Sequence, residues 1–167
     1  KNLEIISFAP DIHSISILKL DGQIKNPKTV GRFLEIHIDG YVKASFLDTN
    51  REVASLMSNI LFSYKDIKTN LNFVDIFRLF LASRTIPSNS VLTSHISSSL
   101  ESVKVDKIVA KLFSDEEIER ENQTVEIINT TSVTGLGARF ARLITNMGGK
   151  VVQVSTENNL RKNSYVL

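Results

Sequence analysis

The fold is decided by VEIINTTSVTGLGARFARLITNMGGKVVQVST, residues 125–156, in which two apolar runs flank a segment of helical periodicity. VEIIN (125–129) predicts a buried strand, GLGARFARLITNMGG (135–149) carries a helix, and KVVQVST (150–156) predicts a second strand. Two strands joined through a helix form a parallel pair with a right-handed crossover, so the segment predicts a βαβ unit. Gly148-Gly149 supplies the positive φ that ends the helix. The expected inner stripe of the helix is Leu136, Phe140, Leu143, Ile144 and Met147.

Gly135 and Gly137, at the start of this helix, raise the question of a phosphate-binding loop. Glycines at such a position let a pyrophosphate approach the amides of a helix N-terminus. The dinucleotide-binding motif needs a third glycine where this chain has Phe140, and the P-loop motif is absent. The hydroxyls of Thr130, Thr131, Ser132 and Thr134 would cap the exposed amides. A sharp turn with close helix–strand packing is therefore favoured, and anion binding stays open as the alternative.

The composition excludes several functional classes. The 20 Lys and Arg residues nearly balance the 18 Asp and Glu residues and are scattered along the chain, so we expect no nucleic-acid partner. The chain has no cysteine, which excludes disulfides, thiolate metal sites and cysteine nucleophiles. Its three histidines fall on different predicted segments without metal-ligand spacing, so neither a metal site nor a cofactor is predicted. The longest apolar stretch, FVDIFRLFLA (73–82), is too short to span a bilayer.

The N-terminal part begins with β-rich segments. Residues 3–9 and 15–20 are separated by Pro10-Asp11 and predict a hairpin. A loop containing Gly22, Pro27 and Gly31 is expected next. In residues 33–46 apolar and polar residues alternate, which predicts extended structure. This extended segment is interrupted at Asp39-Gly40.

Helical periodicity begins at Thr49, which with Glu52 forms a capping box. The stripe of this first helix is Val53, Leu56, Met57, Ile60, Leu61 and Tyr64. A second helix over about 72–84 ends before Ile86-Pro87. Its apolar stripe is typical of core packing and consists of Phe73, Ile76, Phe77, Phe80 and Leu81.

A strand over 91–97 and a short helix over 105–113 follow, and Ser114 with Glu117 forms a capping box for the next helical turn. We expect two units joined near residues 114–122. The predicted fold class is therefore α/β, with an N-terminal mixed sheet covered by helices and a small C-terminal βαβ unit.

The C-terminal segment also resembles a known family. VEIINTTSVTGLGARFARLITNMGGKVVQV is similar to the first half of the LytR C-terminal domain, over about residues 123–167. That domain's signature is a strand ending in Asn-Gly-Thr, a short loop, Gly-Leu-Ala, and a helix with a basic residue. The residues on this pattern are Asn129, Thr131, Gly135, Leu136 and Arg139, while Thr130 replaces its glycine. The resemblance implies ligand-binding candidates at Asn129, Thr131, Gly135, Gly137 and Arg139.

The upstream sequence resembles a shortened, degenerate LytR-CpsA-Psr domain, which commonly precedes that family. ISFAPDIHSISILKL (6–20) is similar to its opening hairpin, IDGYVKASF (38–46) to its Ile-Asp-x-Tyr-Val segment, and TNLNFVDIFRLFLASR (69–84) to its closing helix. The resemblance implies domains at 1–115 and 122–167. It also implies an extracytoplasmic protein of the bacterial envelope, anchored by a membrane segment outside this chain.

Enzymes of that family move glycopolymers from polyprenyl pyrophosphate to peptidoglycan, holding the pyrophosphate with arginines, aspartates and a divalent metal. Here Leu20 stands where the family has an arginine, the arginine-rich segment between Tyr64 and Thr69 is missing, and only Asp21 remains as a catalytic candidate. We therefore expect a non-catalytic envelope protein that binds a wall polymer or a protein partner. The alternative is an active transferase, which would require arginines to converge near Asp21.

Overall fold

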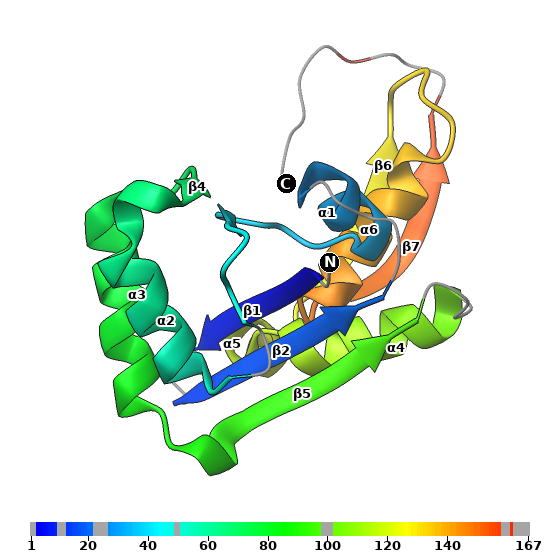
Figure 1. The fold of residues 1–167 in the computed structure, drawn as a ribbon. Coiled ribbons are helices and arrows are strands. Elements are labelled where there is room, and N and C mark those ends of the chain that lie inside the picture. Colours follow the sequence, from blue (N-terminus) through cyan, green and yellow to red (C-terminus); the bar gives the residue numbers. More distant parts are fainter. Residues whose placement is uncertain are drawn as a thin grey trace. The chain divides into compact units, whose positions relative to one another are not determined.

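The computed structural model describes residues 3–9, 13–21, 27–48, 51–97, 102–157 and 161. The chain is an α/β protein that divides into two compact units (Figure 1). The first unit comprises residues 1–31 and 37–100, and the second comprises residues 32–36 and 101–167. None of the helices in these described ranges is long and apolar enough to cross a membrane.

The first unit contains a mixed three-stranded sheet. Strands β1 (Leu3–Ala9) and β2 (Ser14–Leu20) pair antiparallel, which confirms the predicted hairpin. The turn residues Pro10 and Asp11 lie outside the described part of the chain. Strand β5 (Val91–Ile96) pairs parallel with β2, so β2 is the central strand (Figure 1).

Helix α2 (Val53–Phe62) covers the core of this unit, and four residues of the predicted apolar stripe are buried, Val53, Leu56, Met57 and Ile60. Leu61 is partly buried, and Tyr64 lies beyond α2 in the 3₁₀ turn Tyr64–Asp66. The N-cap of α2 is Glu52, whose side chain makes no cap hydrogen bond, and Thr49 of the predicted capping box lies outside the described residues. Helix α3 (Phe73–Thr85) does have a capping box, in which Asn72 accepts from the Asp75 amide at 2.9 Å and Asp75 accepts from the Asn72 amide at 3.3 Å. The buried apolar cluster consists of Ile15, Ile17, Val53, Leu56, Met57, Ile60, Ile76 and Ile86.

The apolar stripe predicted for α3 is core only in part, because Ile76 is buried and Phe80 is partly buried. Phe73, Phe77 and Leu81 are 52%, 42% and 47% exposed. The inward stripe instead follows Ile76, with Leu79, Phe80 and Ser83 at the i+3, i+4 and i+7 positions. This helix carries two apolar stripes, and packing against α2 buries only one of them.

The prediction for residues 33–46 was also wrong in part. Residues Pro27–Leu34 form helix α1, which begins with proline at its first position and ends where Glu35 adopts a positive φ of 47°. Val30 and Leu34, one helical turn apart, are both buried. Of the expected extended segment, only β3 (Val42–Lys43) is a strand, and it pairs antiparallel with β4 (Lys68–Thr69).

The second unit contains the predicted βαβ arrangement. Strands β6 (Thr124–Asn129) and β7 (Lys150–Thr156) are parallel, and helix α6 (Leu136–Asn146) connects them. Gly148 has a φ of 97°, as predicted. A Cβ atom there would lie 3.1 Å from the Asp115 carbonyl oxygen, so close packing reinforces the requirement for glycine.

Helices α4 (Ser102–Phe113) and α5 (Glu116–Glu121) complete the second unit. The predicted Ser114–Glu117 capping box was wrong, because the N-cap is Asp115, whose carboxylate accepts from the Glu117 amide at 2.8 Å. Helix α4 contacts α6 within this unit. The expected family domains at 1–115 and 122–167 stay a prediction.

Candidate functional site

The turn that precedes α6 is held together by its own side chains. The Asn129 carboxamide oxygen accepts from the Thr131 amide at 3.0 Å and from the Thr131 hydroxyl at 2.7 Å, while its Nδ2 donates to the Val133 carbonyl at 3.0 Å. The Thr131 hydroxyl in turn accepts from the Val133 amide at 3.2 Å. Asn129 is 92% buried, being 8% exposed, so these bonds are shielded from water. Asn129 and Thr131, two of the five residues on the family pattern, therefore build the turn.

The two glycines of this turn serve different geometric purposes. Gly135 is the N-cap of α6 and has a φ of 79°, with open space where a Cβ would be. Gly137 is buried, and a Cβ there would lie 3.1 Å from Val154 Cγ1 and 3.4 Å from Asn129 Cβ. Gly135 thus provides a left-handed backbone conformation, and Gly137 provides the close approach of the helix to its sheet.

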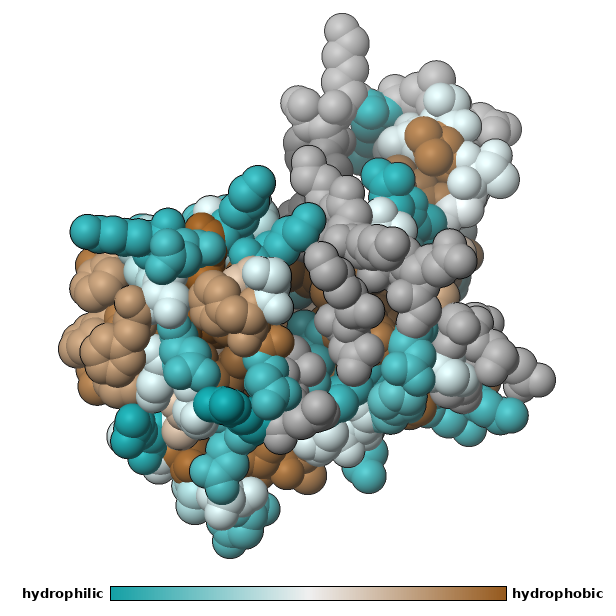
Figure 2. Space-filling view, viewed as in Figure 1, coloured by the Kyte–Doolittle hydropathy of each residue, from teal (hydrophilic) through white to brown (hydrophobic). Residues whose placement is uncertain are grey.

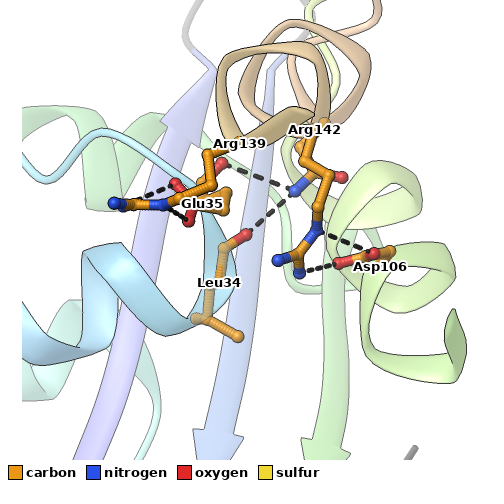
Figure 3. Close-up of polar contacts among 6 residues, drawn as sticks. Leu34, Glu35, Asp106, Arg139 and Arg142 are labelled. Carbon is orange, nitrogen blue, oxygen red and sulfur yellow. Dashed lines mark hydrogen bonds and ion pairs between the residues drawn. The ribbon is translucent and has the colours of Figure 1, made fainter. Parts of the chain in front are cut away.

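Arg139, the basic residue of the pattern, belongs to a polar network within the second unit (Figure 3). Its Nε donates to Glu35 Oε1 at 2.8 Å, and its Nη2 donates to Oε2 at 3.4 Å. Three residues later, Arg142 donates to both carboxylate oxygens of Asp106, at 3.1 and 2.6 Å. The Asn146 Nδ2 donates to the Leu34 carbonyl at 2.9 Å. These three α6 side chains hold the end of α1 and the side of α4.

The charge state of both arginines follows from these contacts. The hydrogen bond to Glu35, and then its negative charge, raise the pKa of Arg139 above its ordinary value. The hydrogen bond to Asp106 likewise raises the pKa of Arg142, and partial burial opposes that rise. Both guanidinium groups are cationic and bound to carboxylates of the chain itself. An anionic ligand at Arg139 would have to compete with Glu35, and the ligand-binding role of the pattern residues stays a prediction.

The network was missed at the sequence level, apart from Arg139. Arg142 and Asn146 lie three and seven positions after Arg139, so they share one face of a helix. Three polar residues on one helix face, next to an apolar stripe, were the sequence signal that could have indicated this network. Their partners Glu35 and Asp106 are 104 and 36 residues away and carry no such signal.

Asp21, the catalytic candidate, follows the C-terminal end of β2, the central strand of the first unit's sheet. Its amide donates to the Ile96 carbonyl at 3.1 Å, and its Oδ2 lies 3.0 Å from His95 Nε2. Both side chains of this pair are about half exposed. Within the described ranges the side chain paired with Asp21 is thus a histidine, and no three His, Asp or Glu side chains there are grouped closely enough to hold a metal ion.

The first unit has an exposed apolar groove between α2 and α3, which we call the aromatic groove. It has a volume of about 630 Å³ and is lined by Leu61, Phe62, Tyr64, Lys65, Asp66, Phe73 and Phe77. Phe62 is 83% exposed. Tyr64 and Phe73 form an edge-to-face pair with ring centroids 5.6 Å apart. In Figure 2 the hydrophobic surface over α3 is visible on the left.

Comparisons with known proteins found no match among protein-family models, curated proteins or solved structures. The resemblance to the LytR C-terminal and LytR-CpsA-Psr domains therefore stays a prediction. The features of the molecule that bear on function are the aromatic groove, the α6 turn and the surroundings of Asp21.

Proposed function

We propose that this chain is a non-catalytic binding module of the bacterial cell envelope, located outside the cytoplasm, which binds an envelope protein through its aromatic groove. The observation that carries the proposal is the groove itself. Its side chains Phe62, Phe73 and Phe77 are adjacent and between 42% and 83% exposed. Contiguous exposed aromatic surface is typical of interaction sites, where such side chains supply most of the binding energy. The envelope setting comes from the sequence resemblance.

The polarity of the groove favours a protein segment over a wall polymer. A glycopolymer presents hydroxyl groups and phosphodiesters, which need hydrogen-bond donors and acceptors in the site. The charged residues that line the groove are Lys65 and Asp66. The Tyr64 hydroxyl already donates to the Leu71 carbonyl at 3.3 Å. An apolar face of a partner protein therefore fits this lining better than a polysaccharide does.

The surroundings of Asp21 support a non-catalytic role. A pyrophosphate is held best by bidentate guanidinium groups. Leu20 occupies the position where the family has its arginine, and the Asp21 carboxylate is paired with His95. Arg139 and Arg142 are engaged by Glu35 and Asp106.

Photocrosslinking tests the proposed binding surface. A benzophenone amino acid placed at Phe62 or Phe77 should give a single dominant crosslinked protein in cells that produce this chain. The matched control position is Leu92 in β5, which is 48% exposed and should give none. The double variant Phe73→Ser/Phe77→Ser should abolish the crosslink from Phe62. A crosslink to polysaccharide would show that the ligand is a wall polymer and not a protein. Equal crosslinking from Leu92 would show that the aromatic groove is not the specific binding surface.

A turnover assay tests the non-catalytic assignment. The purified chain, incubated with magnesium and a glycan linked to polyprenyl pyrophosphate, should transfer no glycan to peptidoglycan. Transfer that disappears in Asp21→Ala, with an unchanged circular dichroism spectrum, would establish the active transferase instead.

A further inference from the structure

The aromatic groove continues along helix α3 as a straight apolar stripe. Phe73 and Phe77, which line the groove, are four residues apart, and Leu81 follows after four more residues, so the three share one helix face. Their exposed fractions lie between 42% and 52%. At about 1.5 Å of rise per residue the stripe is roughly 12 Å long, which is about two helical turns. The apolar surface open to a partner therefore follows the axis of α3 beyond the groove itself.

The backbone along this stripe has no hydrogen-bonding groups to share with a partner. Residues Phe73–Thr85 form one continuous α-helix, whose N–H and C=O groups bond to each other. An extended segment buried here would lack a strand edge to pair with its own N–H and C=O groups. A helical segment bonds its backbone groups internally, so it can bury an apolar face on this surface without unsatisfied polar groups.

Basic side chains accompany the stripe. Arg78 is exposed and has no hydrogen bond or ion pair with any residue in the described part of the chain. Arg84, in the last turn of α3, is also exposed. Its guanidinium carbon lies 5.1 Å from the centre of the Phe80 ring, and its Nη2 donates to Ser58 Oγ at 3.2 Å. Neither arginine is paired with a carboxylate, so both positive charges remain available to a partner.

The nearby acidic residues do not cancel these charges. Asp75 accepts from the Asn72 amide in the capping box at the other end of α3. Asp66 and Lys65 are neighbours in the groove lining, so their charges offset each other locally. The C-terminal half of the stripe therefore has an excess of positive charge, which is complementary to an acidic partner.

We propose that the segment bound at the aromatic groove is an amphipathic α-helix of the partner protein, with acidic residues beside its apolar stripe; this inference rests on the proposed function. The partner's apolar side chains pack along Phe73, Phe77 and Leu81, and its acidic residues face Arg78 and Arg84. A membrane surface fits less well, because a groove recessed between two helices accepts projecting side chains. A symmetric pair of copies crossing at Phe77 would bring two Arg78 side chains together, and like charges repel.

Crosslink mapping measures the conformation of the bound segment. A benzophenone amino acid is placed in turn at Phe73 and at Leu81 in cells that produce the full chain. These positions are roughly 12 Å apart along α3, a distance that a helix covers in about eight residues and an extended segment in about four. Mass spectrometry should therefore place the two crosslinked partner residues about seven or eight positions apart in one segment, with Asp or Glu beside the apolar positions.

Charge reversal tests the acidic flanks. Arg78→Glu should lower the yield of the crosslink from Phe73 roughly threefold to tenfold, because repulsion replaces attraction at the rim of the interface. Lys107→Glu, an equal change of charge at an exposed position of α4, should leave the yield unchanged. Circular dichroism checks that both variants are folded.

The outcomes separate this proposal from the proposed function. A spacing of about four partner residues, a segment without acidic residues, or an unchanged yield in Arg78→Glu would overturn the acidic helix, while the groove would remain a protein-binding surface. Crosslinks to lipid or to a second copy of this chain would overturn it in favour of a membrane surface or a homodimer. The absence of any crosslink from Phe62, Phe73 and Phe77 would contradict the proposed function itself.

Discussion

Helices α2 and α6 have a similar periodic pattern of apolar residues, yet they pack by opposite means. Helix α2 buries large aliphatic side chains, with Val53, Leu56, Met57 and Ile60 all at most 7% exposed. Helix α6 buries Gly137 and Asn146, while Phe140 on its expected inner stripe is 51% exposed. Periodicity therefore identifies a helix in both cases, but it identifies the buried face only in α2.

The difference has a physical cause in how closely each helix approaches its sheet. Ile15 and Ile17 of the first sheet belong to the same buried cluster as the α2 stripe, so large side chains fill the space between helix and sheet. In α6, Gly137 faces Val154 and Asn129 at distances that leave little space for a Cβ. A helix so near its sheet directs its larger side chains to the flanks. The polar side chains Arg139, Arg142 and Asn146 of α6 then make the contacts to the end of α1 and to α4.

The strongest test of this contrast compares two large-to-small substitutions. Leu56→Ala should reduce the free energy of unfolding by about 2–5 kcal/mol, because it removes a buried aliphatic side chain and leaves a cavity. Phe140→Ala should cost about 1 kcal/mol or less, because half of the ring is already in water. Urea unfolding followed by circular dichroism measures both, with separate transitions fitted if the units unfold independently. Comparable losses would mean that α6 depends on its aromatic stripe after all.

A second test concerns the buried hydrogen bond by which α6 packs against the end of α1. Asn146 is 2% exposed and its Nδ2 donates to the Leu34 carbonyl at 2.9 Å. Asn146→Ala should destabilise the second unit by about 1–3 kcal/mol, because it leaves a carbonyl without its donor. Thr145→Ala, at the neighbouring exposed position, should change stability by less than about 0.5 kcal/mol. If the two variants were equally stable, the hydrogen bond to Leu34 would not contribute to packing.

The smallest effect should come from the turn before α6. Gly135→Ala should cost about 1 kcal/mol, because alanine is strained at a φ of 79° although space for its methyl group is open. Gly135→Asn should cost less, since asparagine tolerates the left-handed conformation better. The melting temperature should not depend on added phosphate. A phosphate-dependent rise that disappears in a folded Gly137→Val variant would make the turn an anion-binding site.

The candidate sites differ in how far the sequence could predict them. The α6 turn was located correctly from Gly135, Gly137 and the hydroxyl-rich segment before them, since turn geometry is a local property of the chain. The aromatic groove was interpreted as core, because Phe73 and Phe77 lie at helical spacing that usually indicates burial. Only the packing of Ile76 against α2 shows that this stripe faces outward.

The sequence alone determined the α/β class, the β1–β2 hairpin, the βαβ unit and the helix end at Gly148, because each depends on local periodicity or on one residue's backbone conformation. Tertiary structure decided which stripe of α3 is buried and that α6 packs through Gly137. It also decided that Arg139 and Asn146 bind Glu35 and the Leu34 carbonyl, over 100 residues away along the chain. Such contacts depend on which distant segments the fold brings together, and neither residue spacing nor periodicity contains that information.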